Sequence, residues 1–392
     1  MAPDLISPAF YGDIDGMHEA FRELRQQGPL WHDEANGLLA VLGHPELIEV
    51  ERRNDLFSSE SGYRSFPQEA GMERDMIALD DPDHAAQRAL VSRRLTPRAV
   101  KRLEPLLGEL ITDLIDGFIA DGEFEVVDQL AAPLPAWLTA HLLGFPPEQA
   151  SLMRSCSERL MRIDQVPHDP DTMAGFMGAI MEFSQELGPL VEERQSAPRD
   201  DLLSVWAHSE LDGCPMDMGV ITQETGLFIS GGAETTRTVI SRGLVELSRH
   251  PDVWGDLAED ASLIPDAVEE LIRWVTPLNN FFRTVTADTE IAGTPVAKDD
   301  RVVLLYPSAN RDERVFDRPY EFNIRRDPNP HVSFGFGTHF CVGASLARLE
   351  LRLLLEALTS RLASIEVSEP PDIEPNVFVG AVRSCRFGFE AR

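Results

Sequence analysis

The longest helix-forming run of the chain constrains its fold most. Residues 218–250 can form about nine turns of one helix at 3.6 residues per turn. Apolar residues spaced three and four apart predict further helices at 100–122, 177–195, 265–275 and 344–362. The strand-like pieces are few and short, at 37–43, 284–306 and 376–382. The sequence therefore predicts a mainly α fold with a small β region.

One domain is expected over residues 1–392. With 43% apolar residues, a chain of this length can bury a large core. It shows no internal repeat, no low-complexity tract and no convincing domain boundary. The prolines that cluster at 307–330 and 369–375 indicate ordered loops rather than linkers.

Charge and cysteine usage exclude several classes of protein. A net charge of −31 argues against nucleic acid and anionic lipid as partners. No apolar run is long enough to cross a membrane, and the first residues lack a signal-peptide pattern, so we expect no membrane span. The four cysteines, 156, 214, 341 and 385, are far apart and lack zinc-like spacing. This usage is typical of a protein of the reducing cytoplasm.

Cys341 stands in an unusual setting, the run "FGFGTHFCVG" at 334–343, directly before the helix-forming residues 344–362. A helix N-terminus stabilises a thiolate. Glycines let the backbone approach something large and flat, and Phe334 and Phe340 would shield the sulfur. A shielded thiolate suits a haem iron. The alternatives are a nucleophilic cysteine, which needs exposure and a nearby base, and a buried structural cysteine.

Two glycines lie inside the long helix, in "FISGGAETTRTVISRG" at 228–243. Each glycine costs a helix about 1 kcal/mol relative to alanine, so the pair needs a reason. Thr235 can donate a hydrogen bond to a carbonyl one turn earlier and bend the helix, which would open a groove. Close packing of the helix against a neighbour is the alternative.

The segment from His84 to Arg102 is basic within an acidic chain and holds no Asp or Glu. It is either a solvated helix face or a docking surface for an acidic partner. His84 and Arg88 are four residues apart, so both can reach one anion from the same helical face.

The run "FGFGTHFCVGASLAR" resembles the haem-binding loop of the cytochrome P450 family, Phe-Gly-x-Gly-x-His-x-Cys-x-Gly, at every fixed position. The resemblance implies the single-domain P450 fold, a triangular prism of helices around haem b (iron protoporphyrin IX). It also implies that Cys341 is the proximal iron ligand and that His339 bonds a haem propionate. Phe334 and Gly335 belong to the same cofactor-binding loop.

Three further elements resemble the family in order and spacing. Glu234 and Thr235 match its acid–alcohol pair, which implies that they supply the protons needed to break the O–O bond. Glu270 and Arg273 match its buried Glu-x-x-Arg pair, a structural role, although alone this spacing is common on helix surfaces. The remaining propionate-binding positions of the family fall on His84, Arg88 and Arg283.

The implied activity is insertion of one oxygen atom from O₂ into a C–H bond of a hydrophobic substrate. The chain carries no flavin or dinucleotide motif, so electrons must come from a partner. The resemblance implies a ferredoxin with its reductase, docking on Arg93, Arg94, Arg98, Arg102 and Arg348. A peroxide-driven haem enzyme and a non-catalytic haem-thiolate sensor are the alternatives. The protein is expected to be a monomer.

Several stretches, among them "LFSSESGYRSF" and "SANRDERVFDRPYEF", resemble actinobacterial hydroxylases of the terminal methyl of the cholesterol or cholest-4-en-3-one side chain. A branched fatty acid, a terpenoid or another secondary metabolite is the alternative substrate. Met161, Met173 and Met177 are further apolar candidates for the lining of the substrate pocket. The main candidates are Gly231, Leu278, Phe281, Phe282, Phe378 and Val379.

Overall fold

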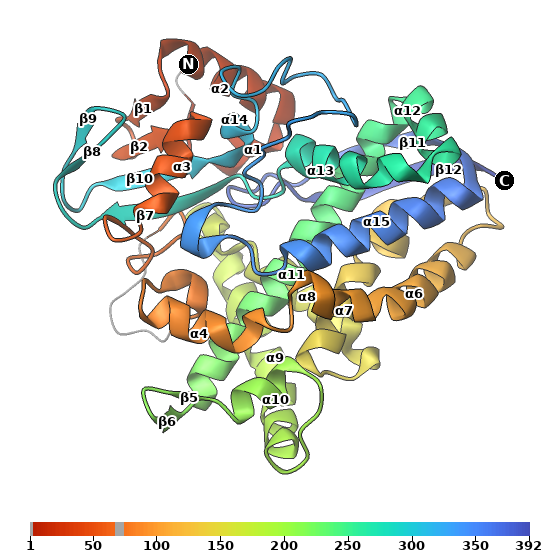
Figure 1. The fold of residues 1–392 in the computed structure, drawn as a ribbon, viewed down its shortest axis with the longest axis horizontal. Coiled ribbons are helices and arrows are strands. Elements are labelled where there is room, and N and C mark those ends of the chain that lie inside the picture. Colours follow the sequence, from red (N-terminus) through yellow and green to blue (C-terminus); the bar gives the residue numbers. More distant parts are fainter. Residues whose placement is uncertain (1–2, 67–73) are drawn as a thin grey trace.

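A computed structural model describes residues 3–66 and 74–392 and confirms a mainly α chain with a small β region. Figure 1 shows the larger sheet at one side and the long helices α11 and α15 crossing the rest of the molecule. The α-helices are α1 (Pro8–Gly12), α2 (Ile14–Gln27), α3 (His44–Arg52), α4 (Asp83–Ser92), α5 (Pro97–Val100), α6 (Glu104–Asp116), α7 (Pro133–Leu143), α8 (Ala150–Leu160), α9 (Asp171–Ser196), α10 (Leu202–Ala207), α11 (Met218–Ser248), α12 (Pro251–Glu259), α13 (Ile264–Val275), α14 (Tyr306–Ala309) and α15 (Ala344–Arg361).

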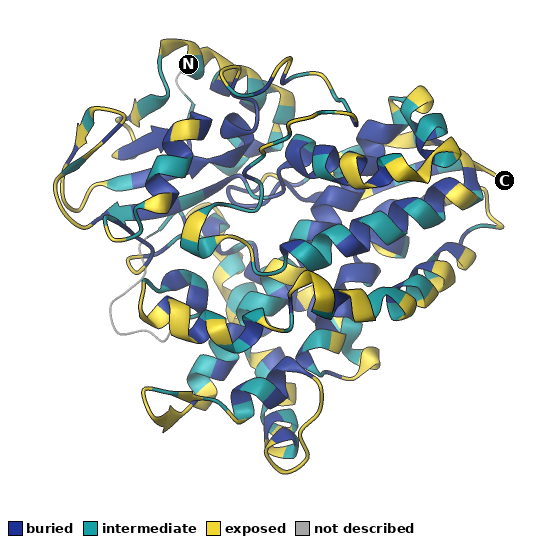
Figure 2. Ribbon diagram, viewed as in Figure 1, coloured by how far each residue is buried: buried dark blue, intermediate teal, exposed yellow. Residues whose placement is uncertain are grey.

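Helix α11 is the central element, as the sequence predicts. Its second half is almost entirely buried, and it contacts α7, α8 and α13. Figure 2 shows the exposed residues gathered on the outer faces of the surrounding helices. The helix ends at Ser248 because Pro251 begins α12, and the residue before a proline avoids helical geometry. One continuous helix spans the glycine pair at 231 and 232.

The larger sheet has five strands in the order β1-β2-β10-β7-β3, and β10 runs parallel to β2 but antiparallel to β7. Side chains alternate between the two faces of a strand. On β7, Phe281 and Arg283 therefore share one face, while Phe282 points to the other. The strands are β1 (Leu30–Asp33), β2 (Leu38–Val41), β3 (Phe57–Ser58), β4 (Glu123–Glu125), β5 (Glu210–Leu211), β6 (Cys214–Pro215), β7 (Asn280–Val285), β8 (Thr289–Ile291), β9 (Thr294–Val296), β10 (Arg301–Leu305), β11 (Leu362–Ile373) and β12 (Val382–Ala391).

The C-terminal strands differ from the expectation. Strands β11 and β12 form a long antiparallel pair that joins β4. Neither strand is predicted from the sequence. Prolines and frequent acidic residues in β11 hide its period-two pattern. The strand predicted at 376–382 is wrong except for a single bridge between Leu278 and Val379 and for Val382, where β12 begins. There Asn376 Oδ1 accepts from the backbone N–H groups of Phe378 and Val379, and such a local bond replaces the ladder of a sheet.

A fully buried ion pair ties α13 to the loop that leads toward Cys341. Arg273 donates to both carboxylate oxygens of Glu270 at 2.7 Å, and both side chains are 0% exposed. Arg273 also donates to the backbone oxygens of Asn310 and Pro319, at 2.9 and 3.1 Å. Arg326 lies 3.1 Å from the same carboxylate. The pair thus fixes the backbone of residues 310–326 against α13.

Replacing Arg273 with methionine should lower the free energy of unfolding by about 3 kcal/mol or more, because it strands a buried carboxylate and two carbonyl oxygens. Denaturation by urea measures the loss. The matched control is Arg318→Met, whose side chain is 64% exposed and should cost less than about 0.5 kcal/mol. Equal losses in the two variants would show that the buried pair does not stabilise this fold.

Candidate functional site

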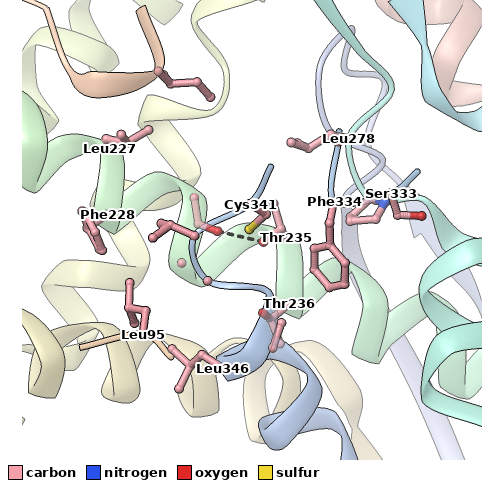
Figure 3. Close-up of a pocket in the computed structure, with 18 of the residues that line it drawn as sticks. Leu95, Leu227, Phe228, Thr235, Thr236, Leu278, Ser333, Phe334, Cys341 and Leu346 are labelled. Atoms are coloured by element: carbon pink, nitrogen blue, oxygen red, sulfur yellow. Dashed lines mark hydrogen bonds between the residues drawn. The ribbon is translucent and has the colours of Figure 1, made fainter. Parts of the chain in front are cut away.

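A cavity opens between α11 and the loop 334–343, lined mostly by apolar side chains. Figure 3 shows Leu227 and Phe228 on one side and Leu278 on another, with Thr235 and Cys341 nearer the middle. The lining residues come from α4, α7, α11, β7 and α15 as well as from the loop. Parts of the chain that are far apart in sequence therefore enclose one space.

Backbone geometry explains the glycines around Cys341. Gly335 and Gly337 have φ values of +70° and +69°, a left-handed conformation that glycine adopts at little cost. A Cβ on Gly337 would lie 2.4 Å from the backbone oxygen of Glu51. The loop folds back on itself, with the Cys341 N–H donating to the Phe334 oxygen at 2.8 Å. The Cys341 sulfur is thereby presented to the cavity just before α15 begins.

The Cys341 side chain is exposed to the cavity rather than packed in a core. The surrounding protein raises the pKa of its thiol, and the backbone N–H of Gly343 and the charge of Arg88 offset this only in part. The start of α15 therefore does not by itself make this thiol acidic. A coordinating metal ion deprotonates a thiol outright, so an iron ion at the sulfur would resolve this conflict.

Basic side chains gather on one side of the cavity. The rings of His84 and His339 lie 4.2 Å apart, and both residues line the cavity with Arg88 and Arg283. Arg88 donates to the Phe340 oxygen at 2.5 Å, and Arg283 donates only to a backbone oxygen. Among the described residues, neither arginine is ion-paired. This side of the cavity therefore holds two arginines without an ion pair among the described residues, although the Glu51 carboxyl lines the same cavity and its pKa is raised by burial and lowered in part by Arg283.

The surroundings also lower the pKa of both histidines on this side of the cavity. Burial, together with the nearby charges of Arg283 and His84, lowers the pKa of His339 to about 2. Nε2 of His84 is buried without a hydrogen-bond partner, while its Nδ1 contacts Asp81 and Thr338. Two carboxylates placed here would satisfy these donors. We call His84, Arg88, Arg283 and His339 the cation cluster. This cluster and the Cys341 thiol line the same cavity, an arrangement that fits a haem with its two propionates.

Glu234 and Thr235 are adjacent on α11 and face different surroundings. The Thr235 hydroxyl lines the cavity and donates to the Gly231 oxygen at 2.8 Å. Glu234 is 3% exposed and pairs with Arg237 at 3.1 Å. Arg237 in turn pairs with Glu158 at 2.7 Å. Burial raises the pKa of Glu234, and Arg237 partly offsets it.

The predicted pocket residues divide into two layers. Gly231, Leu278 and Phe281 line the cavity. Phe282 does not, because strand alternation turns it into the cluster around Leu5 and Tyr11. Phe378 and Val379 lie behind the lining, packed with Met161. Met173 and Met177 lie on the exposed face of α9, at 44% and 48% exposure.

Several lining residues were missed from sequence. Leu227 and Phe228 lie one turn before Gly231, so helical periodicity could have placed them on the same face. Met76 and Ile77 lie in a short 3₁₀ turn, Met76–Ala78, which gave no periodic signal. Glu350, on α15, is 1% exposed, and burial raises the pKa of its carboxyl to about 8. The sequence around Glu350 gives no sign that this carboxyl is buried.

The expected docking residues differ in exposure and in pairing. Arg93, Arg98 and Arg102 are exposed and make no ion pair with any described residue. Arg94 pairs with Asp200. Arg348 pairs with Glu269 at 2.6 Å and stacks on Phe334. Three of the five arginines are therefore free of a partner within the part of the chain that the structure describes.

Within the described residues, no helix is both long enough and apolar enough to span a membrane. Neither do these residues bring three or more His, Cys, Asp or Glu side chains together as a metal-binding group. The single thiol at 341 is thus the metal-ligand candidate that the cavity offers. A cytoplasmic location stays a prediction.

A buried carboxyl joins α11 to the segment that carries Met76. Glu224 is 1% exposed, and one of its oxygens accepts from the Met76 N–H at 2.7 Å. The other oxygen is buried without a partner. Burial, with Asp75 nearby, raises the pKa of Glu224 to about 8. This contact holds two lining residues, Met76 and Ile77, against α11.

The free energy of unfolding should depend on pH through Glu224. A carboxyl with a raised folded pKa keeps its proton where the unfolded chain has lost it, so stability falls as pH rises from about 4.5 to about 8. Glu224→Gln removes this term. The variant should gain about 3–4 kcal/mol on wild type between pH 5 and pH 8, measured by urea denaturation. Glu109→Gln, at an exposed position of α6, is the control, and a similar gain there would contradict the assignment.

Comparisons with known proteins agree with the site. The family model described as Cytochrome P450 matches residues 169–383. The chain is 38% identical to a steroid C26-monooxygenase of Mycolicibacterium smegmatis, covering 97% of this chain and 94% of that one. It is 34% identical to a methyl-branched lipid omega-hydroxylase of Mycobacterium bovis, over 95% of this chain and 91% of that one. A Mycobacterium marinum cytochrome P450 solved with pseudoionone superposes with a TM-score of 0.91 at 31% identity, over 98% of both chains.

Proposed function

The chain belongs to the cytochrome P450 family, and on that premise we propose that this monooxygenase hydroxylates the terminal methyl group of a steroid side chain. Cholest-4-en-3-one and cholesterol are the proposed substrates. The observation that carries the proposal is 38% identity to a steroid C26-monooxygenase over 97% of the chain. The apolar lining of the cavity supports it, because an aliphatic side chain is bound by burial of apolar surface.

Haem b is the proposed form of the cofactor. When bound, it supplies activation of dioxygen and transfer of one oxygen atom to a C–H bond, while the second atom leaves as water. Cys341 would ligate the iron, and His84, Arg88, Arg283 and His339 would bind the two propionates. These basic groups would neutralise carboxylates that are costly to bury alone.

Thr235 and Glu234 would handle protons. The Thr235 hydroxyl donates its hydrogen bond to the Gly231 oxygen, so the hydroxyl oxygen remains free to accept a hydrogen bond in the cavity. Glu234 must rotate away from Arg237 to reach the same space. Its raised pKa favours the protonated form that can donate, and Glu158 at the other end of the Arg237 contact is nearer solvent. After that rotation, Glu234 would deliver a proton from α11 to the cavity.

Electrons would come from a ferredoxin and its reductase. Arg93, Arg98 and Arg102 lie within a basic surface on a chain whose net charge is −31. Such a surface attracts an acidic partner while the rest of the molecule repels it. Arg88, in α4 directly before this segment, donates to the Phe340 oxygen in the loop that bears Cys341.

Titration of the ferric protein with cholest-4-en-3-one tests the substrate. A saturable blue shift of the Soret band at micromolar ligand, followed by a terminal alcohol in turnover with NADH, ferredoxin and reductase, is expected. A thiolate-type spectrum that does not shift and yields no steroid product would sink the steroid assignment. Turnover with hydrogen peroxide alone would support the peroxide-driven alternative, and absence of any turnover would support a sensor.

A branched aliphatic lipid is the second candidate substrate. It is favoured by 34% identity to a methyl-branched lipid omega-hydroxylase over 95% of the chain. Both substrates present a terminal methyl on an aliphatic chain, so the cavity does not distinguish them by polarity. The same titration with a methyl-branched fatty acid compares the two, and the tighter ligand with the single product identifies the class.

Substitution Thr235→Ala should reduce hydroxylated product per NADH by about 10²-fold, because removing a positioned proton-handling group typically costs 10²–10⁴ in rate. NADH consumption should continue and release hydrogen peroxide instead. Thr222→Ala is a matched control, since the half-buried Thr222 makes the same kind of bond, to the Met218 oxygen at 2.7 Å, but does not line the cavity. If both variants kept wild-type coupling, Thr235 would have no role in proton delivery.

Reversing the charge at Arg98 and Arg102 should raise the KM for ferredoxin by about tenfold at low ionic strength. The effect should shrink as salt is added, because exposed charges are screened. Steady-state NADH oxidation with varied ferredoxin measures it. Arg318→Glu, on an exposed turn outside this surface, should leave the KM unchanged. A KM that is insensitive in the double variant would place the docking surface elsewhere.

A further inference from the structure

Three segments that do not line the cavity are joined directly behind its wall. They are residues 62–65, residues 161–165 after α8, and residues 374–379 before β12. Asp164 lies at their junction and is 1% exposed. One of its oxygens accepts from Arg64 Nε at 2.7 Å, and the other from the Ser65 N–H and hydroxyl at 2.9 and 2.7 Å. Both carboxylate oxygens are thus bound by the 62–65 segment.

Arg64, held by Asp164, covers the aromatic ring of Phe378. Its guanidinium carbon lies 3.6 Å from the centroid of the Phe378 ring, a close cation–π contact. Arg64 is 9% exposed and also donates to the Met161 oxygen at 3.3 Å. A guanidinium in this position depends on Asp164, because among the described residues no other carboxylate pairs with it.

The Phe378 ring in turn supports the lining. It meets the Phe281 ring at 5.3 Å and 81°, an edge-to-face contact. Tyr63 packs against both rings, at 5.9 and 6.5 Å. Phe281 is the member of this group that lines the cavity. We call Tyr63, Phe281 and Phe378 the aromatic wall.

The segments are also held by their backbones. Arg301 of β10 donates to the backbone oxygens of Arg64 and Ser65, at 2.8 and 3.1 Å. Asn376 donates to the Met161 oxygen at 3.3 Å. Two layers of fixed groups therefore stand behind Phe281, and Asp164 is the one carboxylate in contact with Arg64 within the described chain.

We propose that Asp164 is a positioning residue for regioselectivity: it holds Arg64 against Phe378 and so fixes the aromatic wall that limits how far an aliphatic chain enters the cavity. The inference rests on the proposed function, since it assumes that a terminal carbon of such a chain is hydroxylated. A rigid wall favours one carbon over its neighbour because the two differ by a single methylene in depth. Discrimination of one methylene in an apolar pocket is typically about 10–200-fold.

Two variants weaken the support while leaving the lining residues intact. Asp164→Asn keeps the shape and an acceptor for Ser65 but leaves the buried guanidinium without a counter-charge. Arg64→Lys keeps the charge pair but removes the flat group that covers Phe378. Asp169→Asn, an exposed position in the same connection, is the matched control.

The haem-loaded variants are compared in turnover of cholest-4-en-3-one, with products identified by mass spectrometry. In Asp164→Asn and Arg64→Lys, the ratio of terminal to subterminal alcohol should fall about tenfold, with more NADH consumed per product. The Asp169→Asn ratio should equal that of wild type. Unchanged ratios in both wall variants would overturn the inference while leaving the hydroxylase standing. No hydroxylated product from wild type would overturn the proposed function instead.

Hydrogen exchange decides the inference without any substrate. Backbone amides of residues 376–381 should exchange about tenfold faster in Asp164→Asn than in wild type, and at the wild-type rate in Asp169→Asn. Exchange that is the same in all three proteins would show that Asp164 does not hold the wall. Arg64→Lys provides the same comparison should Asp164→Asn fail to fold.

Discussion

The buried contact between Glu270 and Arg273 is the constraint on which the site depends. Arg273 fixes the backbone oxygen of Asn310 at 2.9 Å. The Asn310 side chain then accepts from the Val332 N–H and donates to the Ser333 hydroxyl, both at 2.8 Å. Ser333 immediately precedes the loop that bears Cys341. Two charges without solvent exposure thus set where the thiol stands relative to α11.

Around that fixed loop, basic groups, apolar groups and buried ion pairs occupy different parts of the site. The basic side chains on one side of the cavity include two arginines without an ion pair among the described residues, which fits an acidic cofactor and not an apolar substrate. The rest of the lining is largely apolar and suits an aliphatic ligand. Two buried acids lie one layer out, where Asp164 pairs with Arg64 and Glu234 pairs with Arg237.

The sequence predicted the parts of this arrangement that repeat locally. Helical periodicity found α11 and α15, and the loop motif found Cys341 with its glycines, since each depends on nearby residues. Alternation on β7 would also have separated Phe282 from Phe281 and Arg283, had the strand been given a register. The prediction failed where long-range packing decides, as for β11, whose prolines and acids are accepted because β12 pairs with it along its length.

The same reason explains what the motifs left out. Asp164 and Arg64 lie 100 residues apart in the chain, and nothing local to either marks them as partners. Glu234 was placed beside Thr235 by sequence, but 3.6 residues per turn separates neighbours by about 100°, so one faces the cavity and the other faces Arg237. Chemistry could be predicted from the motifs, whereas orientation required the fold.

The most direct test of the account is the absorption spectrum of the reduced protein with carbon monoxide, for wild type and Cys341→Ser. Thiolate ligation predicts the long-wavelength Soret band of a haem-thiolate complex in wild type and its loss in the variant, with haem still retained by the cation cluster. A wild-type spectrum typical of histidine ligation, or a thiolate-type band that survives the substitution, would contradict the assignment of Cys341 and the function built on it.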